Sequence, residues 1–89
     1  MTTFQRYTKA IIEPLNETRE KSKGLFKGWE TQYLYHITLT RPGFNNYTET
    51  WWCPSDDEAE KVAVNVLAEQ NAKITAMEDR HNRIRVVNA

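Results

Sequence analysis

The chain has 89 residues, of which 39% are hydrophobic and 27% charged, and its 12 basic side chains are balanced by 12 acidic ones. This composition predicts a single folded domain over residues 1–89 and excludes a wholly disordered chain. The lack of a basic excess disfavours a dedicated nucleic-acid binder. The single cysteine, Cys53, excludes an internal disulfide and a cysteine-based zinc site.

The N-terminal segment, residues 4–13, fits two kinds of element. Phe4, Tyr7 and Ile11 follow a helical spacing, yet Tyr7 and Ile11 also share one face of a strand. We favour the strand, because a lone hairpin with one helix needs more sheet to be stable. Residues 16–28 are then predicted to form a long polar loop, and loops of this length are often functional.

Residues 31–40 carry the clearest strand pattern. Aromatic and branched aliphatic side chains occupy every second position there, as in a strand with one buried face. Residues 41–46 contain Pro-Gly and Asn-Asn pairs, which favour turns and predict a hairpin connection. Residues 47–53 then return as the second strand of that hairpin.

A helix is predicted over residues 56–70, directly after Pro54. Ser55 and Glu58 have the spacing of a capping box, and acidic residues fill the first turn. The apolar positions that follow fall on one helical face, which indicates an amphipathic helix laid on a sheet. Beyond it, residues 74–77 and 83–87 are predicted to form short strands, either as a hairpin or as one bent strand.

These elements predict an α+β fold in which an antiparallel sheet of three to five strands has one amphipathic helix packed on one face. A hairpin followed by a helix is similar to the order found in many small modules, including arm-type DNA-binding domains and small phage-encoded inhibitors. Topology alone implies little about function.

The segment from residue 19 to residue 29 interleaves basic and aromatic side chains. Arg19, Lys21, Lys23 and Lys27 precede Trp29 in this segment. Such a pattern can contact phosphates while an aromatic ring stacks on a base. The alternative, which we favour, is a solvated loop whose apolar residues tuck against the edge of the core. Those apolar residues are Leu25, Phe26 and Trp29.

Two adjacent tryptophans, Trp51 and Trp52, close the predicted hairpin. Neighbouring strand residues point to opposite faces, so only one of the two can face the helix. The other is expected on the far face, where an exposed tryptophan would be a candidate contact for a partner. Coverage of that face by the N-terminal segment or by a second copy of the chain is the alternative.

No catalytic or metal site is predicted. Cys53 and His36 lie on neighbouring strands, but no orienting acid accompanies them, and a buried structural cysteine is the favoured interpretation. His36 and His81 have no metal-binding spacing. The acidic residues 56–60 are explained by the helix cap. We expect no cofactor.

The function predicted from sequence is a non-enzymatic protein-interaction module, such as a phage- or prokaryote-encoded inhibitor or regulator. Nucleic-acid binding through the basic 19–29 segment and the hairpin aromatics is the less favoured alternative, and the neutral net charge leaves a homodimer open. We expect a cytoplasmic location and no membrane partner, because the sequence shows no signal-peptide core and no long apolar run. The candidate partner-binding residues are Trp29, Trp52, Lys21, Lys23, Lys27, Arg83 and Arg85.

Overall fold

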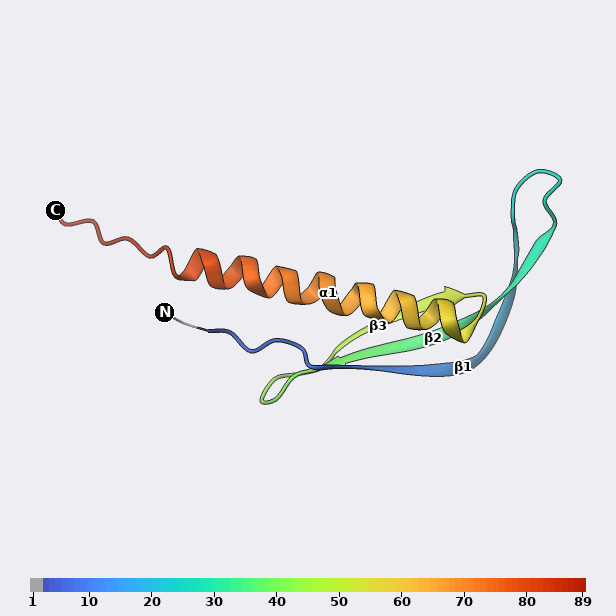
Figure 1. The fold of residues 1–89 in the computed structure, drawn as a ribbon, viewed down its shortest axis with the longest axis horizontal. Coiled ribbons are helices and arrows are strands. Elements are labelled where there is room, and N and C mark those ends of the chain that lie inside the picture. Colours follow the sequence, from blue (N-terminus) through green and yellow to red (C-terminus); the bar gives the residue numbers. More distant parts are fainter. Residues whose placement is uncertain (1–2) are drawn as a thin grey trace.

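The structure, a computed structural model that describes residues 3–89, contains a three-stranded antiparallel sheet followed by one helix (Figure 1). The elements are β1 (Lys9–Ser22), β2 (Trp29–Thr40), β3 (Tyr47–Cys53) and α1 (Asp56–His81). The strands lie in the order β1-β2-β3, so β2 is central and the other two are edge strands. The α+β class and a strand number between three and five are therefore confirmed.

The hydrophobic core forms where β2 meets α1. Ile37 and Leu39 have no exposed surface, and they pack in one cluster with Ala63 and Val66 of α1. A second, adjoining cluster contains Tyr35, Cys53 and Ala59. Burying an aliphatic side chain of this size contributes about 1.5–3 kcal/mol. A small number of residues at one end of the sheet therefore holds the helix in place.

Strand β1 is longer than the sequence predicts. The preference for a strand is confirmed for residues 9–13, whereas residues 4–8 have no regular secondary structure. The prediction of a long polar loop over residues 16–28 is wrong, because β1 continues to Ser22 and only residues 23–28 form a loop. These strand residues are polar on both faces, so they carry no alternating hydrophobic signal.

The helix is also longer than predicted. The prediction of a strand at residues 74–77 is wrong, because these residues belong to the helix. α1 has 26 residues and continues through Ile74, which is only 3% exposed. Ile74 lies eight residues beyond Val66 and so repeats the buried face of the helix. Residues 83–87 do not form the predicted strand either, and they extend beyond the helix without regular structure.

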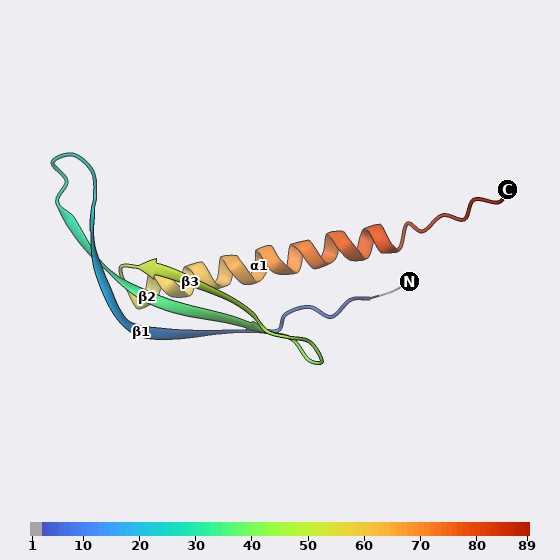
Figure 2. The same cartoon turned by 180° about the vertical axis from the view of Figure 1, so that it is seen from behind.

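The β1–β2 ribbon bends at an irregularity in β1. Pro14 pairs with Tyr35 and Thr18 pairs with Tyr33, so residues 15–17 of β1 lie opposite the single residue Leu34 of β2. Extra residues of this kind bend a strand and increase its twist. Figures 1 and 2 show the distal part of the hairpin rising past the start of α1. We call this part, residues 18–33, the hairpin arm.

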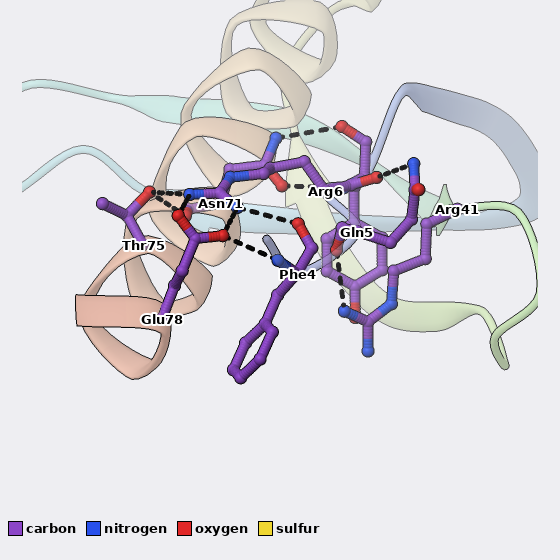
Figure 3. A network of polar contacts seen from close by, with 8 residues as sticks. Phe4, Gln5, Arg6, Arg41, Asn71, Thr75 and Glu78 are labelled. Atoms are coloured by element: carbon purple, nitrogen blue, oxygen red, sulfur yellow. Dashed lines mark hydrogen bonds and ion pairs between the residues drawn. The ribbon is translucent and has the colours of Figure 1, made fainter. Parts of the chain in front are cut away.

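The segment before β1 is bound to the second half of α1 (Figure 3). The carboxylate of Glu78 accepts hydrogen bonds from the Phe4 N–H at 2.6 Å and from Arg6 Nη1 at 2.5 Å. Asn71 exchanges two hydrogen bonds with the backbone of Tyr7, at 2.8 and 3.0 Å. The helix therefore remains attached to the chain even where it extends beyond the end of the sheet.

Candidate protein-interaction surface

The hairpin arm ends in a closed loop over residues 23–28. The Lys23 N–H donates to the Gly28 carbonyl at 2.9 Å, which closes the base of the loop. Gly24 and Gly28 have φ angles of 118° and 82°, which glycine adopts without steric cost. Phe26 has a φ of 61°, which is uncommon for a bulky residue. The loop therefore has a defined backbone shape that depends on both glycines.

Large apolar side chains at the tip of the arm lie in solvent. Leu25 is 82% exposed, Phe26 98% and Trp29 69%. The expectation that these residues tuck against the edge of the core is wrong, because the bend in the ribbon carries the tip away from the core (Figure 1). The same stretch carries three exposed lysines, Lys21, Lys23 and Lys27. The tip thus combines exposed apolar surface with positive charge.

Behind the tip, Arg19 links the arm to the end of β3. Its Nε donates to Oε1 of Gln32 at 2.8 Å, and its guanidinium lies 4.6 Å from the centre of the Trp52 ring. Gln32 is 7% exposed and donates to a Glu30 carboxylate oxygen at 3.0 Å. A cation over an indole ring contributes about 0.5–2 kcal/mol. Arg19 therefore contacts a tryptophan of the sheet, a contact that the sequence did not indicate.

The strand register confirms that Trp51 and Trp52 lie on opposite faces of the sheet. Trp51 is opposite Tyr35, on the face that contacts α1, and Trp52 is opposite Leu34 on the other face. Trp51 still has 40% of its surface exposed, since β3 is an edge strand. Trp52 is partly exposed beneath the guanidinium of Arg19. Both tryptophans therefore retain exposed surface.

The candidate partner-binding residues do not form one surface. Trp29 and the three lysines lie at or beside the tip of the arm, and Trp52 lies on the open face near its base. Arg83 and Arg85 follow the end of α1, at the opposite end of a molecule 67 Å long (Figure 1). The candidates therefore lie in three places, which are the arm, the open face beside its base and the C-terminal segment.

Cys53 and His36 are not brought together. Cys53 is 2% exposed and belongs to the core beneath α1, where burial raises the pKa of its thiol. His36 lies on the other face of the sheet, opposite Thr50, with Nδ1 3.9 Å from a carboxylate oxygen of Glu13. The sheet thus separates the two groups, and a raised thiol pKa disfavours the reactive thiolate.

The acidic residues at the start of α1 have structural roles. Ser55 accepts a hydrogen bond from the Glu58 N–H at 3.3 Å, which confirms the predicted N-cap. Asp56 accepts a hydrogen bond from the Tyr35 hydroxyl at 2.5 Å. This bond, together with burial, raises the pKa of Tyr35 to about 12. Local sequence patterns do not predict the Tyr35–Asp56 pair, because the partners are 21 positions apart.

A groove of about 470 Å³ lies beside the N-terminal segment. Its lining residues are Thr3, Phe4, Gln5, Arg41, Phe44 and Met77. The Arg41 guanidinium lies over the rings of Tyr7 and Phe44, at 4.7 and 4.4 Å, and donates to the Gln5 carbonyl at 3.2 Å. Arg41 is thus occupied in attaching the N-terminal segment to the β2–β3 loop.

Within residues 3–89, no three histidine, cysteine, aspartate or glutamate side chains gather where they could hold a metal ion. The same part of the chain contains no helix long and apolar enough to cross a membrane. No family model matches the sequence, and neither the curated proteins nor the solved structures include a significant match. The function is therefore inferred from the geometry of the chain itself.

Proposed function

We propose that this chain is a small non-enzymatic module that binds a protein partner through the tip of the hairpin arm. The exposed tip carries the proposal. Leu25 and Phe26 are 82% and 98% exposed, and they lie on a ribbon that extends past the helix. Exposed apolar residues gathered at one place mark interaction sites more often than apolar residues scattered singly.

The chemistry of the tip indicates what the partner offers. The phenyl ring of Phe26 and the indole of Trp29 match an apolar recess, since aromatic side chains dominate the energetics of protein interfaces. Lys21, Lys23 and Lys27 lie close to these residues in sequence and are exposed, so acidic side chains around the recess would complement them. Binding of this kind acts by occluding the partner's surface, which is how an inhibitor or regulator works.

The arrangement of the helix supports the proposal. We take α1 to cover one face of the sheet only, because Ile37 and Leu39 pack with it and the residues that alternate with them do not. The open face carries threonines along β2 and β3 and the Arg19–Trp52 contact near the arm, together with the apolar Ile11 and Leu34. The open face would form the polar rim of the interface with the same partner, while the tip supplies the apolar contact.

A comparison of matched variants tests this proposal. Wild-type protein, Phe26→Ser and Val64→Ser are each used as bait in a lysate of the cells that make the protein. Val64 is 60% exposed on α1 and far from the tip in sequence, so its variant is a control for lost apolar surface. We expect one partner to bind the wild type and Val64→Ser but to be lost with Phe26→Ser, with at least ~10-fold weaker binding of the purified pair.

Retention of every captured protein by Phe26→Ser would contradict the proposed site. A double substitution, Leu25→Ser with Phe26→Ser, adds a second test, because it removes most of the apolar surface at the tip. Neither substitution touches the core, and circular dichroism identical to the wild type would verify that the variants fold. Loss of binding with Val64→Ser alone would place the contact on the helix instead.

A second candidate function is nucleic-acid binding, favoured by Arg19, whose guanidinium lies over the Trp52 ring, and by the three lysines at the tip of the arm. Glu20 and Glu30 lie among these residues and weaken the positive field. Binding to phosphates would fall steeply with salt, since each neutralised phosphate releases counterions. A mobility shift at 50 mM salt that disappears at 200 mM would support this candidate, and no shift at either concentration would remove it.

A further inference from the structure

The segment after α1 has the sequence of a strand without a sheet. Arginine alternates with isoleucine and valine over residues 83–86, Val87 follows, and branched residues of this kind fit a pleated sheet. Ile84, Val86 and Val87 are 70%, 82% and 92% exposed. Figure 1 shows this segment running away from the rest of the molecule. Its apolar residues therefore contribute nothing to the core that the structure shows.

The two edges of the sheet differ in how well they resist pairing. β1 carries Pro14, the irregularity at residues 15–17 and several charged residues, all of which oppose the addition of another strand. β3 has seven residues, no proline and one charged side chain, Glu49. Its outer side is therefore the edge of this sheet that can accept another strand.

The segment cannot reach that edge within its own chain. The Thr8 N–H bonds to the Thr40 carbonyl at the end of the sheet, and the Phe4 N–H bonds to Glu78 near the end of α1. The helix thus overshoots the sheet by about the extended length of residues 4–8, roughly 13 Å. The six residues after α1, 82–87, span at most about 20 Å. A return over the roughly 13 Å by which the helix overshoots the sheet therefore brings only the last of these residues beside β3.

We infer that residues 83–87 add as a strand to β3 of a second copy of this chain. Strand addition to an open edge supplies backbone hydrogen bonds, and alternate side chains supply packing. Placed on the helix side, Ile84 and Val86 cover Trp51, which is 40% exposed there. Arg83, Arg85 and Val87 then lie on the open face. This inference does not rest on the tip of the arm.

A two-fold axis lets each copy give its segment to the other. The exchange is then reciprocal and closes as a dimer rather than a fibre. The formal net charge is zero, so no overall electrostatic repulsion opposes the association. The product is a dimer whose two arms remain free at its outer ends, because the tip and residues 83–87 lie at opposite ends of the molecule (Figure 1).

Mass measurement and hydrogen exchange on the full chain test the inference. Light scattering after size exclusion is expected to show a shift from monomer to dimer as the concentration rises toward about 1 mM. Backbone amides of residues 47–53 and 83–87 should gain protection together with the dimer. A monomer at every concentration would overturn the inference, and so would protection that appears along β1 instead of β3.

Two substitutions at one position separate strand pairing from general apolar association. Val86→Pro removes an N–H and blocks a ladder, so it should raise the dimer dissociation constant at least ~10-fold. Val86→Thr keeps the branched side chain and the N–H, so it should leave dimerisation within a few-fold of the wild type. Residue 86 lies outside α1 and the core, so both variants should fold normally. A dimer that tolerates Val86→Pro would refute the exchange.

Discussion

The two halves of strand β2 lie in different environments, one buried beneath α1 and the other exposed on the hairpin arm. In its second half, Tyr35, Ile37 and Leu39 are 3%, 0% and 0% exposed beneath α1. In its first half, at equivalent alternating positions, Trp29 and Tyr33 are 69% and 42% exposed. One strand with one hydrophobic pattern is therefore buried where the helix covers it and open where the ribbon bends away.

This contrast separates residues that fold the chain from residues available for binding. Apolar side chains under α1 are explained by the core, because removing them from water stabilises the fold. The apolar side chains of the arm have no such explanation, since they remain in water after folding. A set of substitutions that divides along the same boundary would establish the distinction.

Ile37→Ala should have the largest effect on stability. Ile37 has no exposed surface, and its truncation leaves a cavity between the sheet and α1. Such substitutions cost about 2–5 kcal/mol, a large part of the 5–15 kcal/mol by which domains are stable. Urea denaturation followed by circular dichroism measures the loss. Leu25→Ala at the tip is the matched control and should change the free energy of unfolding by less than about 0.5 kcal/mol.

Tyr35→Phe tests the boundary between core and arm. The substitution removes the hydroxyl that donates to Asp56 and should cost about 1.5–3 kcal/mol, the range for hydrogen bonds to charged groups. The bond to Asp56 and burial raise the pKa of Tyr35 to about 12. The protonated hydroxyl therefore contributes fully to the free energy of unfolding below the ordinary tyrosine pKa near 10. This contribution should be lost as the pH rises through about 12.

Unfolding measured from pH 8 upward checks this sign. The wild type should lose stability between about pH 10 and pH 12 by more than Tyr35→Phe does, because only the wild type has the shifted group. Parallel curves for the two proteins would show that the Tyr35–Asp56 bond adds nothing. Tyr33→Phe is the control, since Tyr33 is 42% exposed and lies on the arm.

The sequence predicts the central hairpin and the start of the helix because both carry strong local signals. Alternation from Tyr33 to Leu39 gives β2, and the Ser55 cap places the first residue of α1. The arm was missed because a ribbon exposed on both faces has no alternation to detect. The helix end was missed because Ile74 and Thr75, branched residues typical of strands, are held in α1 by the burial of Ile74.

The sequence predicts which residues belong to the candidate site but not where they lie in the fold. Lys21, Lys23, Lys27 and Trp29 were identified from their residue types, but their projection on an arm depends on the irregularity between Pro14 and Thr18. That irregularity has no sequence signal beyond the proline. The contact of Arg19 with Trp52 joins residues 33 positions apart, and only the register of three strands brings them together. Such long-range pairs are beyond local pattern analysis.

Ser55→Ala should have a moderate effect. The Ser55 hydroxyl accepts from the Glu58 N–H, and removing an N-cap of this kind costs about 1 kcal/mol. Thermal unfolding measures the change, and Ser55→Asp should restore most of it because aspartate also caps helices. An equal loss in both variants would assign the effect to packing rather than to the cap.

The smallest effect is expected at the far end of α1, where Glu78 holds the N-terminal segment. The hydrogen bonds from Arg6 and from the Phe4 N–H hold the pKa of Glu78 below its ordinary value. The contribution of this pair is therefore present above the ordinary glutamate pKa near 4.3 and is lost as the pH falls through the lowered one. Residues 4–8 should then detach from α1 while the core under the helix stays folded.

Amide exchange at Phe4 and Tyr7, followed by NMR as the pH is lowered, measures this detachment. Glu78→Gln should show faster exchange at both residues already at pH 7, because a neutral amide is a weaker acceptor for the Arg6 guanidinium. Glu60→Gln, an exposed position near the start of α1, should leave that exchange unchanged. If Phe4 and Tyr7 exchange only together with the buried amides of Ile37 and Leu39, the N-terminal segment belongs to the core. The molecule would then divide into the arm and everything else.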